Sequence, residues 1–394
     1  MITSKTRILP NESAAVRQLP TLCRTLVLAS LALLLNGCSK SPEVTSATQG
    51  PVRLASWGGK FQEDLIDTWV QPAARAAGVQ IEPGSWNGEY GALTARIKKG
   101  INDWDLIHVE DHYVSVPEAG LLFETFADRV SIPLSDPNLS QKLPQAIPVL
   151  QYAYVLAYYK DAPGLKQQLD SAKQQKPNWA TFWNIAAVPG KRGMRDFPIG
   201  NIEIAISSLG LNVEENLYKP SLSRAELEAV LNKAFERLDQ LKPHVYWWSS
   251  GDQLQKAISS GETKLAAAWS GRVSAAHHDL CATNVECNLD INEATALVAT
   301  DWWVIPKGAK NAAAANTLLK AMYSSPDSPH WAQAFALKQA YSVPLNGLTI
   351  ADPVAARYLS LNSANTNVLG RISHRFWGAN YDWIASRWSM WRAR

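Results

Sequence analysis

The sequence lacks the motifs that identify several common enzyme classes, and it has almost no excess of charge. No P-loop, HExxH, G-x-S-x-G or G-x-G-x-x-G pattern occurs in its 394 residues, so phosphate-loop, zinc-protease, serine-hydrolase and dinucleotide chemistry are not indicated. Its 38 basic and 35 acidic residues nearly balance, whereas a nucleic-acid-binding surface needs a basic excess. We therefore expect no catalytic residue, no cofactor and no nucleic-acid partner.

Cysteine is also scarce, with four in the whole chain. Two of them, Cys281 and Cys287, are six positions apart, and in an oxidising compartment such a pair typically closes a disulfide. A zinc site that adds His277 and His278 is the alternative, but four ligands within eleven residues are cramped for a tetrahedral ion. We expect the disulfide and no metal ion.

Long apolar runs are absent except for one short run, residues 26–35, which follows a basic stretch and ends in LNGC. This layout is typical of a secretory signal peptide, and the run is shorter than the roughly 20 apolar residues that cross a bilayer. A cysteine after a small residue resembles the bacterial lipoprotein signal. It predicts a signal peptide over 1–37, lipid on Cys38 and a flexible tether over 38–50. An ordinary signal peptide with an incidental cysteine is the alternative. Both interpretations place the protein in the periplasm or cell envelope. In the lipoprotein interpretation, lipid alone attaches it to the membrane.

The remaining residues are too many for one hydrophobic core, which predicts two lobes. Strand-like and helix-like segments alternate from residue 52 to residue 110, as in an α/β lobe with a largely parallel sheet. Pro72 is expected to kink or end the first helix. The β-prone, aromatic segment 149–160 would cross into the second lobe, and a strand over 301–306 would return. We expect lobe 1 to span 51–150, with about 299–345 returning to it, and lobe 2 to span 151–298, with about 346–394 packed on it.

Ligands of such sheets bind at the carboxyl ends of the strands. Five candidate segments lie at those ends: Trp57–Lys60, Glu110–Tyr113, Trp247–Asp252, Trp269–Arg272 and Asp301. They come from both expected lobes, as a cleft between lobes requires. The sixteen tryptophans exceed what a core alone explains, and a pocket lined by aromatic faces would account for the surplus.

Several segments, taken in order, resemble one known family over about residues 51–392. They are SWGGKFQEDLIDTWVQPAARAAGVQI, WDLIHVEDHYVSVPEAGLL, VYWWSSGDQLQKAISSGETKLAAAWSGR, DWWVIPKGAKN, AYSVPLN and FWGANYDWIASRW. The family is the extracellular solute-binding proteins of bacterial ABC importers, in the spermidine/putrescine-binding-like group. The resemblance implies the α/β, type II-like fold of periplasmic binding proteins, with two hinged lobes and the ligand in the cleft between them. It also implies a monomer without catalytic residues that delivers its ligand to an ABC permease in the cytoplasmic membrane.

The resemblance assigns seven residues to ligand binding. Trp57 and Trp269 would form aromatic walls of the cleft. Glu110 and His112 would contact the ligand from a loop, with Asp111 between them. Asp301 would be the carboxylate that pairs with a ligand ammonium, and Tyr341 would lie near the rim of the cleft. The chain also departs from the family pattern. Gly58-Gly59-Lys60 replaces a polar turn, Ala299 replaces a tryptophan, and Asp196 is the nearest candidate for an acidic pair in lobe 2.

Aromatic faces and carboxylates together favour a cationic ligand, because tryptophan faces attract ammonium groups and buried carboxylates pair with them. The sequence thus predicts a polyamine such as putrescine or spermidine, or a related organic amine. Binding of an opine, an amino-acid derivative or a sugar by the same fold is the alternative. An extracytoplasmic hydrolase that uses Glu110 or Asp111, and a ligand sensor that docks on a membrane partner, are further alternatives from other classes.

Overall fold

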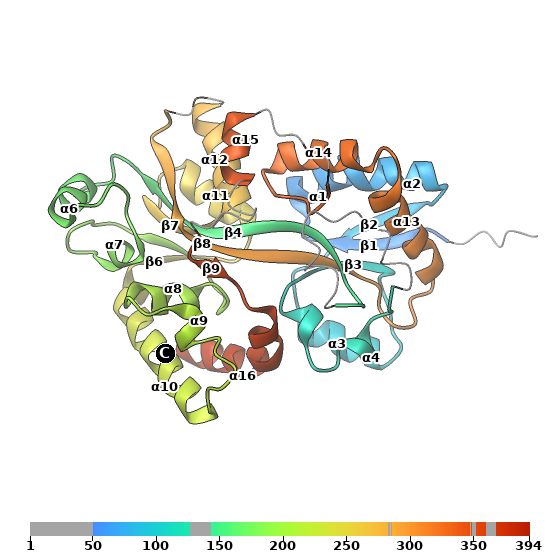
Figure 1. Ribbon diagram of the computed structural model, residues 1–394, viewed down its shortest axis with the longest axis horizontal. Helices are drawn as coiled ribbons and strands as arrows, with labels where there is room; N and C mark the ends of the chain where they lie inside the picture. Colours follow the sequence, from blue (N-terminus) through green and yellow to red (C-terminus); the bar gives the residue numbers. More distant parts are fainter. Residues whose placement is uncertain are drawn as a thin grey trace, which may run out of the picture. The chain divides into compact units, whose positions relative to one another are not determined.

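A mixed sheet of nine strands runs through the described part of the chain (Figure 1). The computed structural model describes residues 50–126, 143–282, 284, 286–346, 348, 352–359 and 368–394. The chain divides into the units Met1–Ala47 and Thr48–Arg394. The predicted signal peptide, Cys38 and the predicted tether up to residue 49 therefore lie outside the described residues.

The strands follow the order β2-β1-β3-β8-β4-β7-β5-β6, and β9 pairs with β8. Their bounds are β1 Val52–Ser56, β2 Ile81–Ser85, β3 Leu106–Glu110, β4 Ile147–Tyr159, β5 Arg192–Arg195, β6 Val245–Trp248, β7 Leu265–Trp269, β8 Leu289–Val304 and β9 Gly370–Arg371. The pairs β1–β2, β1–β3, β5–β6 and β5–β7 are parallel, as expected from the alternation of strands and helices. The pairs β3–β8, β4–β7 and β4–β8 are antiparallel, so the sheet is mixed.

Helices cover both faces of the sheet (Figure 1). In that view α1 (Gly59–Leu65), α2 (Gln71–Ala77), α11 (Gly251–Ser259), α12 (Ser270–Cys281), α13 (Ala312–Ser324), α14 (Ser328–Gln339) and α15 (Pro353–Leu359) lie above it. Below it lie α3 (Tyr90–Lys98), α4 (Ala119–Leu122), α8 (Asn201–Ser208), α9 (Val213–Asn216), α10 (Arg224–Leu241) and α16 (His374–Arg392). The remaining helical segments are η1 (Ile66–Val70), η2 (Tyr113–Ser115), α6 (Leu165–Ala172), α7 (Trp179–Trp183) and η4 (Lys242–His244).

Two long central strands join the halves of the sheet. β4 and β8 pair antiparallel from Ile147 opposite Trp303 to Tyr159 opposite Leu289, and the register shifts between Tyr154 and Leu156. The sequence predicts only the last part of β8, because three polar residues, Asn292, Glu293 and Thr295, interrupt its apolar pattern. They lie at the register shift, where Leu297 pairs with Tyr154 and Asn292 pairs with Leu156. The expected lobe boundaries, near residues 150 and 298, fall inside these two strands.

Pro72 does not end the first helix. The helical segments α1, η1 and α2 follow one another directly, and Pro72 lies in the first turn of α2. The π-helical turn η1 precedes it, so the missing N–H of proline falls where the hydrogen-bond pattern changes anyway.

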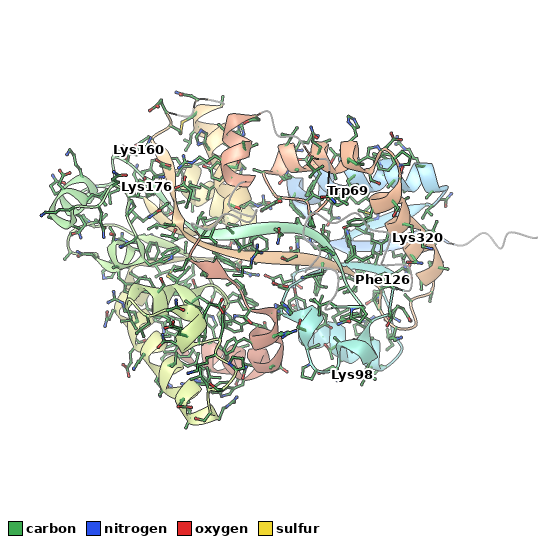
Figure 2. The ribbon with its side chains drawn as sticks, viewed as in Figure 1. Trp69, Lys98, Phe126, Lys160, Lys176 and Lys320 are labelled. Atoms are coloured by element: carbon green, nitrogen blue, oxygen red, sulfur yellow. A yellow bond between two sulfur atoms is a disulfide. The ribbon has the colours of Figure 1, made fainter. Side chains whose placement is uncertain are left out.

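The core contains many of the tryptophans. The largest fully buried side chains include Trp69, Trp248, Trp302, Trp303 and Trp377. Figure 2 labels Trp69, whose indole Nε1 donates to the carbonyl oxygen of Met322 at 2.9 Å and so joins η1 to α13. A buried indole N–H that finds a carbonyl contributes packing area without leaving an unpaired donor. None of the described helices is both long enough and apolar enough to cross a membrane.

The last helix, α16, lies in the segment 346–394 that the sequence analysis places on lobe 2, and it packs on both halves of the sheet. Trp388 and Trp391 are buried, and their indoles donate to Asp196 and Asp239 at 3.1 and 2.6 Å. Near its start, α16 approaches η2 so closely that a Cβ on Gly378 would lie 2.3 Å from the carbonyl oxygen of Ser115. A glycine is therefore required at this contact.

Replacing Gly378 with alanine is expected to destabilise the protein, because either α16 or η2 must move. Such overpacking costs roughly 1–3 kcal/mol. Gly91→Ala is the matched control, since a Cβ there meets nothing within 4 Å and alanine favours the helix by up to about 1 kcal/mol. Thermal unfolding should show a lower Tm for Gly378→Ala and an equal or higher Tm for Gly91→Ala. Equal Tm values for the two variants would contradict the close contact.

Candidate functional site

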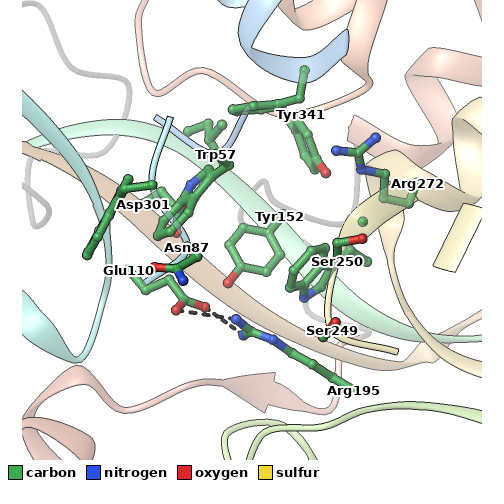
Figure 3. A pocket seen from close by; sticks show the side chains of 15 residues that line it. Trp57, Asn87, Glu110, Tyr152, Arg195, Ser249, Ser250, Arg272, Asp301 and Tyr341 are labelled. Atoms are coloured by element: carbon green, nitrogen blue, oxygen red, sulfur yellow. Dashed lines mark hydrogen bonds and ion pairs between the residues drawn. The ribbon is translucent and has the colours of Figure 1, made fainter. Parts of the chain in front are cut away.

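The candidate site is a pocket with a cavity of about 220 Å³ (Figure 3). Its volume suits a small molecule rather than a polymer. It is lined by Trp57, Phe61, Trp86, Asn87, Glu110, Leu150, Tyr152, Arg195, Ser249, Ser250, Gly251, Trp269, Arg272, Asp301 and Tyr341. With both carboxylates and both guanidinium groups ionised, this lining is electrically neutral.

Most of the polar lining comes from the carboxyl ends of strands, as the sequence predicts. Trp57 follows β1, Glu110 ends β3, Arg195 ends β5, and Trp269 ends β7. Residues 249–251 follow β6 and begin α11. Asp301 is different, because it lies within β8 and is the register partner of Glu110 in the antiparallel β3–β8 pair.

Five of the seven residues assigned from the sequence line this pocket: Trp57, Glu110, Trp269, Asp301 and Tyr341. Asp111 and His112 do not. Asp111 is buried and accepts a hydrogen bond from the indole of Trp302 at 2.8 Å. His112 packs between the rings of Tyr90 and Tyr381, at 4.6 and 4.4 Å, and burial lowers its pKa to about 4, so it is neutral at pH 7.

Glu110 is already paired with Arg195. The guanidinium Nη1 donates to Oε1 at 2.7 Å, and the Tyr90 hydroxyl donates to Oε2 at 3.3 Å. Burial alone would raise the pKa of Glu110, but the Arg195 charge outweighs it and holds that pKa below its ordinary value. Arg195 also lies over the rings of Phe197 and Trp269, at 4.1 and 4.8 Å. Figure 3 shows this ion pair along one side of the pocket.

Asp301 has a free acceptor. Its Oδ2 accepts a hydrogen bond from the Trp57 indole at 3.0 Å and lies 3.1 Å from His108 Nε2, whereas its Oδ1 is buried without a hydrogen-bond partner. The residue is 5% exposed. Burial raises the pKa of Asp301, and the neighbouring His108 opposes this rise. A buried acceptor without a partner is costly unless a bound molecule satisfies it.

Arg272 has a free donor. Its Nη1 donates to Asp252 at 3.0 Å, but its Nε is buried without a partner, and the residue is 8% exposed. The guanidinium packs on the first residue of α11, where a Cβ on Gly251 would lie 2.3 Å from Nε. Gly271, in the first turn of α12, likewise leaves room for the ring of Tyr341, 2.4 Å from its hypothetical Cβ.

Aromatic rings form the rest of the wall. The rings of Trp57 and Trp86 stack with their centroids 5.3 Å apart. The ring centroid of Tyr152 lies 6.1 Å from that of Trp269 and 6.3 Å from that of Tyr341. In Figure 3, Asp301 and Arg272 lie on opposite sides of Tyr152. Asp301 and Arg272, residues of opposite charge, thus line two ends of the pocket, with an aromatic surface between them.

Sequence reasoning missed Arg195 and Tyr152, and it named Arg272 only within a segment. Asp196, the candidate for an acidic pair, instead binds Arg392, at 2.8 and 2.9 Å, and does not line the pocket. Lys60 is largely exposed, pairs with Asp64 and does not line the pocket either. The strand-end rule points to the neighbours Arg195 and Asp196, because β5 ends there.

Cys281 and Cys287 form a disulfide at the end of α12. His277 is buried, and its Nε2 contacts the carbonyl oxygen of Asn284 at 2.9 Å. Within the residues that the structure describes, no three His, Cys, Asp or Glu side chains are placed to hold a metal ion.

Comparisons with known proteins agree on one family. The model of the family "Bacterial extracellular solute-binding protein" matches residues 69–344. A curated relative, the gamma-aminobutyric acid-binding protein of Pseudomonas aeruginosa, is 27% identical over 340 residues, which cover 86% of this chain and 90% of the relative.

Solved structures show the same fold. The binding protein MotA of Agrobacterium tumefaciens B6, in complex with glucopine, has a TM-score of 0.68 and 22% identity, covering 87% of this chain and 100% of that one. AgtB of Agrobacterium tumefaciens R10, in complex with agropinic acid, has a TM-score of 0.68 and 20% identity, covering 88% and 99%. The mixed α/β sheet of this chain is therefore that of the two-lobed periplasmic binding proteins.

The buried Asp111 predicts a pH-dependent stability difference. Burial raises its pKa from 3.8 to about 7, so the folded state binds a proton that the unfolded state lacks between about pH 4 and 7. Wild-type stability therefore falls as pH rises through this range. Asp111→Asn, which keeps the acceptor for Trp302, does not titrate. The Tm of Asp111→Asn minus the Tm of wild type should therefore be a few degrees larger at pH 8 than at pH 5.

The control for this measurement is Asp103→Asn, because Asp103 is an exposed carboxylate. Its Tm difference from wild type should be the same at both pH values. Parallel pH profiles for wild type and Asp111→Asn would contradict the raised pKa.

Proposed function

Because this chain belongs to the bacterial extracellular solute-binding protein family, we propose that it binds a small zwitterion whose ammonium and carboxylate are several carbon atoms apart. The observation that carries the proposal is the pair of unsatisfied groups in one pocket: Asp301 Oδ1 and Arg272 Nε are both buried and both lack a partner. A ligand ammonium would satisfy the first, and a ligand carboxylate the second.

The charge of the pocket favours a zwitterion over a dication. Glu110 is paired with Arg195, and Asp301 and Arg272 line the pocket with opposite charges, so a ligand with one ammonium and one carboxylate meets an opposite charge at each end. A polyamine would bring a second ammonium to Arg272, and like charges repel strongly in a buried site. Asp301 and the aromatic walls still favour an ammonium group at one end of the ligand, so this part of the organic-amine prediction is kept.

The distance between the two ends favours an amino-acid derivative with separated charges. Asp301 and Arg272 lie on either side of Tyr152 (Figure 3), whereas the two charges of an α-amino acid share one carbon atom. Methylene groups between the charges would pack on Tyr152, Trp57 and Trp269. The printed name of the Pseudomonas aeruginosa relative, a gamma-aminobutyric acid-binding protein, supports a ligand of this kind. The opine and amino-acid-derivative alternative drawn from the sequence is thereby preferred to a polyamine.

Delivery of the ligand to an ABC permease, and attachment to the membrane through Cys38, complete the proposal. The family supports a location in the cell envelope. The hydrolase alternative loses its residues, because Glu110 is bound by Arg195 and Tyr90, and Asp111 does not line the pocket. The ligand-sensor alternative would use the same pocket and differ only in the membrane partner.

Three four-carbon molecules test the ligand charge: 4-aminobutanoate, putrescine and succinate, added to the purified protein expressed from the whole sequence. 4-Aminobutanoate should raise the Tm, since saturation at 100 times Kd adds about 2.7 kcal/mol to the free energy of unfolding. The other two should leave the Tm unchanged. A shift with putrescine alone would restore the polyamine prediction, and a shift with succinate alone would contradict a role for Asp301 as an ammonium partner.

The two anchoring groups are tested by Asp301→Asn and Arg272→Met. Each should weaken binding of 4-aminobutanoate, measured by isothermal titration calorimetry, by roughly 30-fold or more, because losing one partner of a buried charge pair costs about 2–5 kcal/mol. Lys60→Met is the matched control, since Lys60 is outside the pocket, and should keep the wild-type affinity. If Arg272→Met bound as tightly as wild type, the carboxylate end would be assigned wrongly.

A further inference from the structure

A buried serine and a buried histidine stand behind Asp301. Ser56 Oγ lies 3.0 Å from His108 Nδ1, and His108 Nε2 lies 3.1 Å from Asp301 Oδ2. Ser56 and His108 are 0% exposed and do not line the pocket. The contact of Nε2 with Asp301 is as close as an ion pair, but it lacks the alignment of a hydrogen bond. The three residues come from β1, β3 and β8, so the sheet itself holds them in line.

Asp301 lacks a cation of its own when the pocket is empty. Its register partner Glu110 binds Arg195, and the groups that contact Asp301 are the neutral indole of Trp57 and the imidazole of His108. An unpaired carboxylate in a buried site is costly. The empty site therefore favours one added proton, either on the carboxylate or on the imidazole, and both arrangements leave the pair neutral.

Ser56 accommodates both protonation states of His108. A hydroxyl donates to a bare Nδ1 and accepts from a protonated one, so the ring can gain or lose a proton without losing this partner. Imidazole is also the side chain that ordinarily changes its charge between pH 5 and 8.

We propose that His108 is a positioning residue for ligand binding: in the empty protein the Asp301–His108 pair holds one proton, and the ligand ammonium displaces it. The proposal rests on the proposed function for the identity of the cationic ligand. When the ammonium binds, Asp301 becomes its counter-ion, and a second cation on the same carboxylate would be repelled. The proton leaves the pair for the buffer, so binding consumes no other reactant.

The surroundings of the pair supply no competing cation in contact with it. Phe61 from α1 and Trp303 from β8 flank the His108 ring, at 5.8 and 5.0 Å. The buried Asp64 of α1 is bound by Lys60 and Gln339. Asp301 also interacts electrostatically with five other titratable groups: Glu110, Asp111, Tyr90, Tyr152 and Tyr341. Of these, Glu110 is neutralised by Arg195, and the tyrosines are uncharged because burial raises their pKa values. Asp111 does change charge in the range of the test, because burial raises its pKa to about 7, so proton release is also counted in an Asp111→Asn background.

The first test needs no ligand. In protein with ¹⁵N-labelled histidine and ¹³C-labelled aspartate carboxyl groups, NMR at pH 6 reports the charge of His108 and Asp301, with signals assigned through His108→Gln and Asp301→Asn. The expected result is one proton on the pair, either as an imidazolium beside a carboxylate or as a neutral ring beside a carboxylic acid. A neutral ring beside an ionised carboxylate at pH 6 overturns the proposal.

The second test counts protons during binding of 4-aminobutanoate, whose own groups do not titrate between pH 5.5 and 8. Calorimetry at pH 6 in two buffers of different ionisation enthalpy should give close to one proton released per ligand. As the pH rises, the Kd should fall tenfold per pH unit over the range in which the Asp301–His108 pair holds its proton. In His108→Gln the buried carboxyl of Asp301 loses the group that opposes the rise of its pKa, so its Kd should keep falling with rising pH to a higher pH than in wild type, and at pH 8 the variant should bind more weakly than wild type.

His277→Gln is the matched control, because His277 is buried in α12 and does not line the pocket. It should release as many protons as wild type. Release of no proton by wild type, or the same pH dependence of Kd in wild type and His108→Gln, overturns the proposal. If no amine in the panel binds, the proposed function fails, and the NMR result at pH 6 still decides whether the pair holds a proton.

Discussion

Two carboxylates lie opposite each other across a pair of buried strands, and the rest of the site follows from that placement. The β3–β8 register sets Glu110 against Asp301, and directly opposed side chains of an antiparallel pair point to the same face. Like charges in such a position destabilise a sheet unless each finds its own partner. Glu110 finds Arg195, which β5 brings from the other half of the sheet. Asp301 finds indole and imidazole groups and retains one free oxygen. The two carboxylates therefore differ: Glu110 is closed in an ion pair, whereas Asp301 keeps an oxygen without a partner.

Much of the architecture can be read from the sequence, because strand ends and glycine-rich turns leave local signals. Trp57, Glu110 and Trp269 follow from the rule that parallel sheets bind ligands at their carboxyl ends, and all three line the pocket. Arg195 could not be separated from Asp196 without the structure, because the choice between neighbours depends on the pleat of β5. Asp111 and His112 lie outside the lining for a different reason, because the chain turns into η2 directly after β3 and carries them away from the pocket.

The identity of the ligand is the least local property of the chain. Aromatic and acidic residues near the strand ends pointed to an amine, and the resemblance led to polyamines. Arg272 contributes charge of the opposite sign from the first turn of α12, and its availability depends on which of its nitrogens the neighbouring Asp252 occupies. Such partnerships join residues twenty positions apart through a helix, a strand and a turn, so no sequence pattern reveals them. The family could be inferred from ordered segments, whereas the balance of charge required the folded arrangement.

The two glycines in the first turns of α11 and α12, Gly251 and Gly271, also define where this pocket can be redesigned. A side chain at position 251 would enter the space of the Arg272 guanidinium, and one at position 271 the space of the Tyr341 ring. Directed evolution of a biosensor from this scaffold should therefore leave both positions unvaried and place its diversity on the wall that separates the charged ends, above all at Tyr152. Ligands of a new length would then be selected without losing the anchor that orients them.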